Sequence, residues 1–106
     1  MANTYTQLYI HIVFAVEHRD SLIRSFFNDE LMKYMTGIIQ NKGNKLLAIN
    51  TMSDHVHLFL GLNPENAISN LVKDIKVSST DFINEKNSLR GRFHWQEGYD
   101  AFSFSH

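Results

Sequence analysis

The chain has 106 residues, a length that fits one domain and leaves no room for a second of ordinary size, so we expect residues 1–106 to form a single domain. It has 0 cysteines, which excludes disulfides, thiolate metal sites and cysteine nucleophiles. With 10 Lys and Arg residues against 11 Asp and Glu residues the net charge is −1, so only local basic patches could hold a polyanion. The sequence shows no signal peptide and no membrane-spanning stretch, and we expect a cytoplasmic protein.

The first two predicted elements are a strand and a long helix. Apolar residues alternate from Leu8 to Val16, which is the period of a strand packed on one face, and this leaves Tyr9 and His11 on the other face. Apolar spacings of three and four residues then predict a helix over 26–39. We expect this helix to end near Gly43, because glycine readily takes the left-handed conformation that follows a helix.

Two further strands should follow, joined by a turn at Ser53 and Asp54. The segment KLLAINT at 45–51 is typical of a strand, and HVHLFLGL at 55–62 alternates along its length. Side chains two residues apart share one face of a strand, so His55 and His57 must point the same way. If the apolar side chains of this strand face the helices, the two histidines lie together on the open face of the sheet.

The remainder predicts a second helix and an aromatic strand. The segment 63–65, Asn-Pro-Glu, offers an N-cap, a proline for the first helical position and an acid for the helix dipole. We therefore expect a helix to start there and to run to about Lys86, loosened over 77–80 by residues that form helices poorly. The aromatic stretch at 93–106 predicts a strand or a short hairpin around Gly98.

The element order is strand, helix, strand, strand, helix, strand. This order predicts an α+β fold with two helices on one face of an antiparallel sheet, as in ferredoxin-like and RRM-like domains. Such a sheet has one face that the helices do not cover. The histidine pair is expected on that face.

The residues alone leave the chemistry of the histidine pair open. The Cα atoms of His55 and His57 should lie about 6.5 Å apart along the strand, close enough for both imidazoles to bind one divalent cation. A metal needs at least one more ligand, and the same spacing also suits half-buried histidines that bond to backbone groups. His11 and Tyr9 would stand near the pair if their strands are neighbours.

Two other classes of protein fit parts of the sequence. In a non-catalytic module that binds single-stranded nucleic acid, Tyr9, Phe59 and Trp95 would be stacking platforms for bases. A small histidine-metal hydrolase would need a carboxylate general base, and only Asp54 and Glu97 are candidates. We consider this second class the weaker one.

Four segments carry a family pattern: SDHVHLFLGL at 53–62, HIVFAVEHRD at 11–20, the stretch 68–86, and FHWQEGYDAFSFS at 93–105. The first closely resembles the histidine–hydrophobe–histidine (HUH) signature of IS200-like single-tyrosine transposases of bacterial insertion sequences, including their repeat-associated domesticated relatives. The other three are similar to the first strand and its exit, to the second helix, and to the aromatic strand region of that family. The resemblance covers nearly the whole chain.

The resemblance implies DNA strand transfer on single-stranded DNA hairpins. In the family the two motif histidines hold a divalent cation, usually Mg²⁺ or Mn²⁺, at the scissile phosphate, and a tyrosine attacks and becomes joined to the 5′ phosphate. His55 and His57 correspond to the metal ligands. Family members are typically dimers, and the aromatic last strand would expose an edge that a homodimer could pair. Contacts to DNA are expected from His11, Arg19, Lys73 and Lys76.

The sequence departs from the family pattern at its end. The family's nucleophile and a further polar metal ligand lie on a helix beyond the aromatic strand, and this sequence ends at His106 before such a helix. None of the four tyrosines occupies the nucleophile position; they are Tyr5, Tyr9, Tyr34 and Tyr99. We therefore expect a transposase-like domain without the C-terminal catalytic helix, which binds metal and DNA but does not complete covalent cleavage.

Overall fold

The structure is a computed structural model that describes residues 8–17, 25–86 and 93–104. Its elements, in chain order, are β1 (Leu8–Ala15), α1 (Ser25–Asn41), β2 (Lys45–Thr51), β3 (His55–Leu62), α2 (Ile68–Lys86) and β4 (Asp100–Phe104). Neither helix is long and apolar enough to cross a membrane, as judged over these ranges. Arg19 lies outside the described residues.

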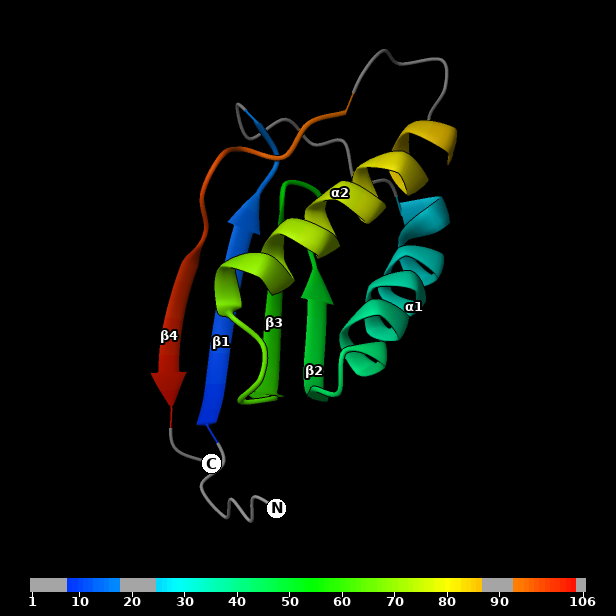
Figure 1. Cartoon of the computed structure of the whole chain (residues 1–106). Coiled ribbons are helices and arrows are strands. Elements are labelled where there is room, and N and C mark those ends of the chain that lie inside the picture. The colour runs from blue at the N-terminus through cyan, green and yellow to red at the C-terminus, as the bar shows by residue number, and fades with distance from the viewer. Residues whose placement is uncertain (1–7, 18–24, 87–92, 105–106) are drawn as a thin grey trace.

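The four strands form one antiparallel sheet in the order β2-β3-β1-β4. Figure 1 shows α1 and α2 side by side over the same face of this sheet, while the opposite face is left open by the described residues. The predicted α+β, ferredoxin-like plan is therefore confirmed. The two central strands are β1 and β3, so side chains on their open face have neighbours on both sides.

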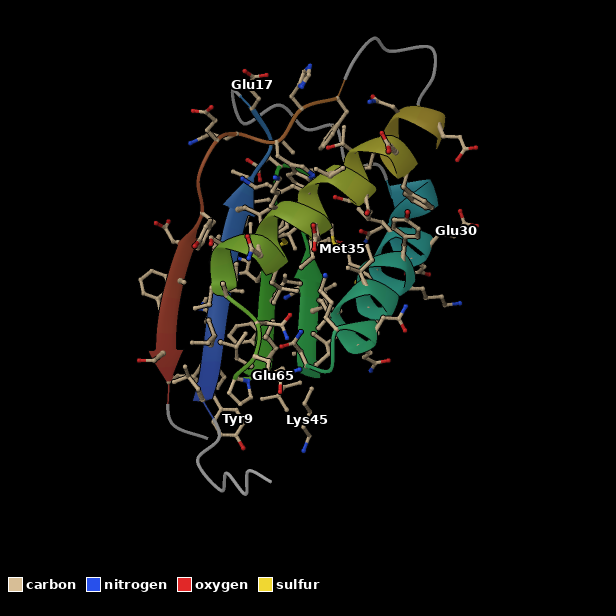
Figure 2. All side chains as sticks on the ribbon, in the orientation of Figure 1. Tyr9, Glu17, Glu30, Met35, Lys45 and Glu65 are labelled. Carbon is tan, nitrogen blue, oxygen red and sulfur yellow. The ribbon has the colours of Figure 1, made fainter. Side chains whose placement is uncertain are left out.

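Alternation along the central strands builds the core. From Ile10 to Phe14 in β1 and from Val56 to Leu60 in β3, every second residue is buried under the helices and the residues between are half-buried. The core joins these side chains to apolar residues of both helices: Ile10, Ile12, Phe14, Leu31, Met35, Ile39, Val56, Leu58, Leu60, Leu71, Val72 and Ile75. Figure 2 shows that Tyr9 and Lys45 lie at one end of the sheet and Glu17 at the other.

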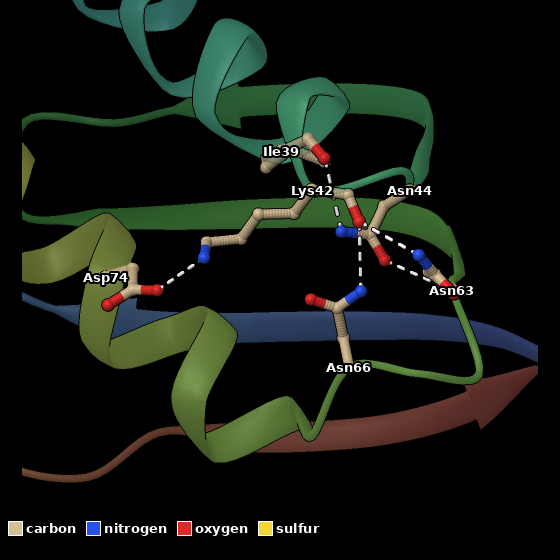
Figure 3. Close-up of polar contacts among 6 residues, drawn as sticks. All are labelled: Ile39, Lys42, Asn44, Asn63, Asn66 and Asp74. Atoms are coloured by element: carbon tan, nitrogen blue, oxygen red, sulfur yellow. Dashed lines mark hydrogen bonds and ion pairs between the residues drawn. The ribbon is translucent and has the colours of Figure 1, made fainter.

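The second helix starts later than predicted. It begins at Ile68, and the preceding segment forms a turn in which the Asn63 side chain accepts a hydrogen bond from the Glu65 N–H at 3.0 Å. The side chains of Asn63 and Asn66 each donate to the carbonyl of Lys42 at 3.0 Å (Figure 3). These bonds tie the segment to the end of α1, so the chain must turn before α2 can begin.

Residues 42–44 and 63–66 form a bonded corner, and this corner also fixes the end of α1. Gly43 has φ +82°, the left-handed conformation expected there, and its neighbour Asn44 is buried. The Asn44 amide donates to the Ile39 carbonyl at 3.1 Å, and its oxygen accepts from the Asn63 backbone N–H at 2.7 Å. Figure 3 also shows the ion pair of 2.6 Å between Lys42 and Asp74, which joins the two helices.

The middle of α2 is continuous helix, against the expectation that 77–80 would loosen it. The hydroxyl of Ser79 donates to the Ile75 carbonyl at 2.6 Å, and that of Thr80 donates to the Lys76 carbonyl at 2.7 Å. These bonds satisfy the hydroxyl groups within the helix. Ser79 is also fully buried, so tertiary packing overrides the poor intrinsic propensity of this stretch.

The aromatic segment forms one strand, not a hairpin, within the described residues. Gly98 has φ +85° and precedes β4, while Trp95 pairs with Val16 in an isolated bridge. The indole of Trp95 is 9% exposed and donates to the Ser79 hydroxyl at 3.0 Å. The suggestion that Trp95 is a base-stacking platform is therefore wrong, because its ring lies in the core.

Candidate functional site

His55 and His57 lie side by side on the open face of β3, as predicted. The residues that alternate with them, Val56 and Leu58, are fully buried, while both histidines are only half-buried. The two imidazole centroids are 4.9 Å apart, with the rings nearly perpendicular. Two imidazoles this close can bind one metal ion or one phosphate group.

Each of the two imidazoles has a partner at Nδ1. Nδ1 of His55 lies 2.7 Å from Oδ1 of Asp54, the residue of the turn that leads into β3. Nδ1 of His57 lies 2.8 Å from Nε2 of His11 on β1. Both contacts use Nδ1, so Nε2 of each ring remains for a ligand. This is the donor arrangement of metal-binding histidines, whose second nitrogen is bonded to an outer partner.

The electrostatics of the site favour a neutral imidazole at His57. Burial, followed by the neighbouring imidazoles of His55 and His11, lowers the pKa of His57 below its usual 6.5. A neutral ring keeps a lone pair on one nitrogen, as a metal ligand must.

The donor set fits a divalent cation with two protein ligands. No cluster of three or more His, Cys, Asp or Glu side chains placed to hold a metal ion occurs within 8–17, 25–86 and 93–104. His11 is close to the pair, yet its Nε2 is directed at His57, so this nitrogen is not available as a third ligand. A cation held by His55 and His57 would have its other positions filled by water and by oxygen atoms of a bound phosphate.

Rings continue along the open face beyond the histidine pair. The His11 ring lies between His57 and Phe59, with centroid distances of 5.1 and 4.2 Å and interplanar angles of 22° and 12°. Phe102 on β4 is tilted against His11 at 5.8 Å and is 55% exposed. The rings of His11 and Phe59 cover each other's faces, so Phe102 is the most accessible ring of this cluster.

The predicted DNA-binding residues do not form one surface. His11 lies beside the histidine pair, whereas Lys73 and Lys76 lie on α2, which covers the opposite face of the sheet. The Lys76 ammonium donates to the carbonyls of Gln96 and Gly98 at 2.9 and 2.6 Å. Burial lowers the pKa of Lys76, and Glu97 opposes this effect.

Both lysines line an open groove of about 540 Å³ between α2 and the segment 94–99. Its walls are mainly apolar and include Val72, Trp95 and Tyr99. The histidine pair is not part of this groove.

One neighbour of the pair, Asn50, was not predicted from the sequence. Asn50 of β2 is the register partner of His57 and is exposed on the same face. A register shift between Leu46 and Ala48 precedes this pairing, and alternation within KLLAINT gives no sign of it. The sequence placed His11 near the pair only on the condition that the two strands are neighbours, which they are, and it did not predict the bond between His11 and His57.

Comparisons with known proteins identify a family of similar proteins. The family model described as "Transposase IS200 like" matches residues 4–106. The chain is 32% identical over 98 residues to the ISDra2 transposase TnpA of Deinococcus radiodurans, covering 88% of this chain and 70% of that protein. A crystal structure of a proposed transposase from Deinococcus radiodurans R1 superposes with a TM-score of 0.86 at 25% identity, covering 99% of this chain and 85% of the other.

A second solved structure shares the fold. It is a REP-associated tyrosine transposase bound to a REP hairpin, with a TM-score of 0.68 and 13% identity. The match covers 100% of this chain and 62% of that one.

Proposed function

The chain belongs to the IS200-like transposase family, and from this premise we propose that the open sheet face is the metal-binding half of a site that acts on single-stranded DNA hairpins. The observation that supports this most directly is the pair His55 and His57, each held at Nδ1 and each presenting Nε2 on the same face. Because the family acts in DNA transposition, we propose that the substrate is DNA. We assign the protein's action to the cytoplasm, where such DNA lies.

The residues suit Mg²⁺ or Mn²⁺ as the ion. Transposases of this family are generally metal-dependent. Two imidazoles leave several coordination positions for oxygen atoms, which both ions accept. When bound, the ion stabilises negative charge on the phosphoryl oxygens of the scissile phosphate. His55 and His57 would hold the ion, and the described chain would leave the phosphate free to approach from solvent.

A hairpin substrate is supported by the REP-associated relative, which is itself bound to a hairpin. His11 lies nearest the proposed phosphate position among the candidate DNA contacts. Lys73 and Lys76 would contact the backbone elsewhere, because the two lysines lie on the helical side of the sheet. Arg19 remains a proposed contact, outside the described residues.

The described tyrosines are poorly placed to be the nucleophile. Tyr9 lies four residues along β1 from Val13, the register partner of His57, which corresponds to about 13 Å. Tyr34 stacks on Phe82 at 5.0 Å on the helical side of the sheet. Tyr99 lines the groove against α2. Tyr5 is outside the described residues. We propose that these tyrosines do not attack the phosphate and that the chain by itself is catalytically incomplete.

A homodimer through β4 is part of the proposal. Within the described residues β4 pairs with β1 on one side only, and its residues 100–103 are exposed. An exposed edge of this kind can pair with the same strand of a second copy. Light scattering after size exclusion tests it: we expect a dimeric wild type and a weakened dimer in Ser103→Pro, because proline disrupts strand pairing. A monomeric wild type would refute pairing at this edge.

The alternative is a non-catalytic module for single-stranded nucleic acid, favoured by the exposed ring of Phe102. One experiment separates the two. A labelled DNA hairpin, the unpaired strand and the duplex are titrated with protein, with and without Mn²⁺. The transposase proposal expects hairpin preference that Mn²⁺ strengthens and that His57→Ala removes. Equal affinity for all three DNAs, with no response to Mn²⁺, would leave only the generic binder.

A further inference from the structure

We propose that His11 is a positioning residue that sets the tautomer of His57, so that Nε2 of His57 is presented to the divalent cation. The inference rests on the metal site proposed above. It gives a β1 side chain a part in a site whose ligands both lie on β3.

The contact between the two rings constrains their protons. Nε2 of His11 and Nδ1 of His57 are 2.8 Å apart, so one nitrogen donates a hydrogen and the other accepts it. If His57 donates, its proton is on Nδ1 and its Nε2 lone pair is free for a metal. If His11 donates, the proton of neutral His57 is on Nε2, and metal binding there is blocked. His11 therefore selects between a ligand and a non-ligand form of His57.

The fold holds His11 in the orientation that this role needs. The register places Phe59 on β3 and Phe102 on β4 directly opposite His11, so its ring stands between two aromatic neighbours. It stacks on Phe59 at 4.2 Å with an interplanar angle of 12°. Packing against these rings fixes the orientation of the His11 ring, so that its Nε2 points at His57.

His55 shows why the second ligand needs such a residue. Its Nδ1 contacts the carboxylate of Asp54, which when ionised can only accept a hydrogen bond. The proton of His55 is thereby fixed on Nδ1. His57 has no carboxylate at Nδ1 and depends on how the His11 ring carries its own proton. With a proton on Nδ1, His11 leaves Nε2 as an acceptor and completes the arrangement.

Two variants separate the hydrogen bond from the packing. His11→Phe retains a ring against Phe59 but has no nitrogen, and His11→Gln loses the ring while offering a carbonyl oxygen at similar reach. Tautomers are assigned in the metal-free protein by two-bond ¹H–¹⁵N correlation, and Mn²⁺ affinity is measured by electron paramagnetic resonance. We expect His57 as the Nδ1–H tautomer in the wild type and in His11→Gln. In His11→Phe we expect mixed tautomers and Mn²⁺ affinity lower by about 10- to 100-fold.

The matched control is His94→Gln, which removes an exposed histidine from the segment before Trp95 and should change neither measurement. An Nε2–H tautomer of His57 in the wild type, or wild-type tautomer and Mn²⁺ affinity in His11→Phe, would overturn the positioning role. If the wild type binds no Mn²⁺, the metal site of the proposed function fails. The tautomer in the wild type and in His11→Phe would still decide whether His11 controls His57.

Discussion

His11 contacts His57 across the two central strands, although the two residues are not opposite each other. The register partner of His57 is Val13, and His11 lies two residues before it on β1, so the bond of 2.8 Å is diagonal. Aromatic side chains can span such diagonals. His57, one of the two proposed metal ligands, is thus coupled to β1, the other central strand of the sheet.

Removing either member of the pair should abolish Mn²⁺ binding. With two protein ligands, the loss of one imidazole leaves a single ligand that cannot compete with water for a labile ion. We expect His55→Ala and His57→Ala to give flat calorimetric titrations with Mn²⁺, while His94→Gln retains the wild-type isotherm. Titrations of His57→Ala that match the wild type would show that the ion binds elsewhere.

The free energy of unfolding should depend on pH because His57 takes up a proton more readily in the unfolded chain. Because burial lowers the pKa of His57 in the folded state below 6.5, the unfolded chain takes up this proton first as the pH falls. The contribution of His57 is therefore fully present above pH 6.5 and is lost as the pH drops through the pKa of the folded state. Chemical denaturation with a chelator present should show this loss in the wild type and a smaller slope in His57→Gln. Equal slopes would contradict the lowered pKa.

The sequence predicted the strands and the histidine pair well because alternation is a local signal. In HVHLFLGL every second residue is a large apolar one, and the burial of Val56 and Leu58 follows from that pattern alone. The start of α2 was misplaced because it depends on Asn63 and Asn66 bonding to Lys42, a residue more than 20 positions away. No local pattern reports such a contact.

The aromatic residues also show that local sequence patterns do not report tertiary contacts. Sequence grouped Trp95 with Tyr9 and Phe59 as rings for stacking, since all three are aromatic residues in strand-like segments. The structure separates them, because Trp95 packs edge-on against Phe14 at 4.7 Å and bonds to Ser79 of α2. Which face a ring occupies depends here on a bridge between residues far apart in the chain.

The corner that ends α1 should tolerate no side chain at Gly43. Its φ of +82° disfavours other residues, and an added Cβ would lie 2.6 Å from the Asn63 amide nitrogen. We expect Gly43→Ala to lower the free energy of unfolding by at least about 1 kcal/mol. The matched control is Gly37→Ala within α1, where a Cβ meets nothing within 4 Å. That change should stabilise the protein by up to about 1 kcal/mol. Equal effects at both positions would refute the role of this corner.

The bond between Trp95 and Ser79 should also be measurable. Ser79 is fully buried, and its hydroxyl accepts the indole N–H at 3.0 Å. In Ser79→Ala the indole N–H is left buried without this acceptor, which should cost about 1–3 kcal/mol of unfolding free energy. The same substitution in a Trp95→Phe background should cost less, because the donor is gone. A cycle of denaturant melts with no coupling between the two changes would speak against this bond.

The chain should bind hairpin DNA without forming a covalent adduct. In-line attack requires a phenol held close to the scissile phosphate, and an ion that only stabilises charge cannot replace it. Tyr34 and Tyr99 lie on the helical side of the sheet, and Tyr9 stands about 13 Å along β1 from the row of His57, on a central strand with little freedom to move. The proposed metal site would therefore be in place, while none of the three tyrosines that the structure describes is placed to attack.

The test for this prediction incubates hairpin DNA, labelled at the 5′ or the 3′ end, with the 106-residue chain and Mn²⁺. A denaturing gel should show no protein–DNA adduct and no cleaved strand, even where the same samples show binding under native conditions. Tyr9→Phe and Tyr99→Phe should then behave as the wild type does. An adduct with the wild type that Tyr9→Phe abolishes would require β1 to deliver its phenol across the sheet to the phosphate. That result would place the nucleophile on the same open face as the histidine pair and overturn our view that the chain is catalytically incomplete.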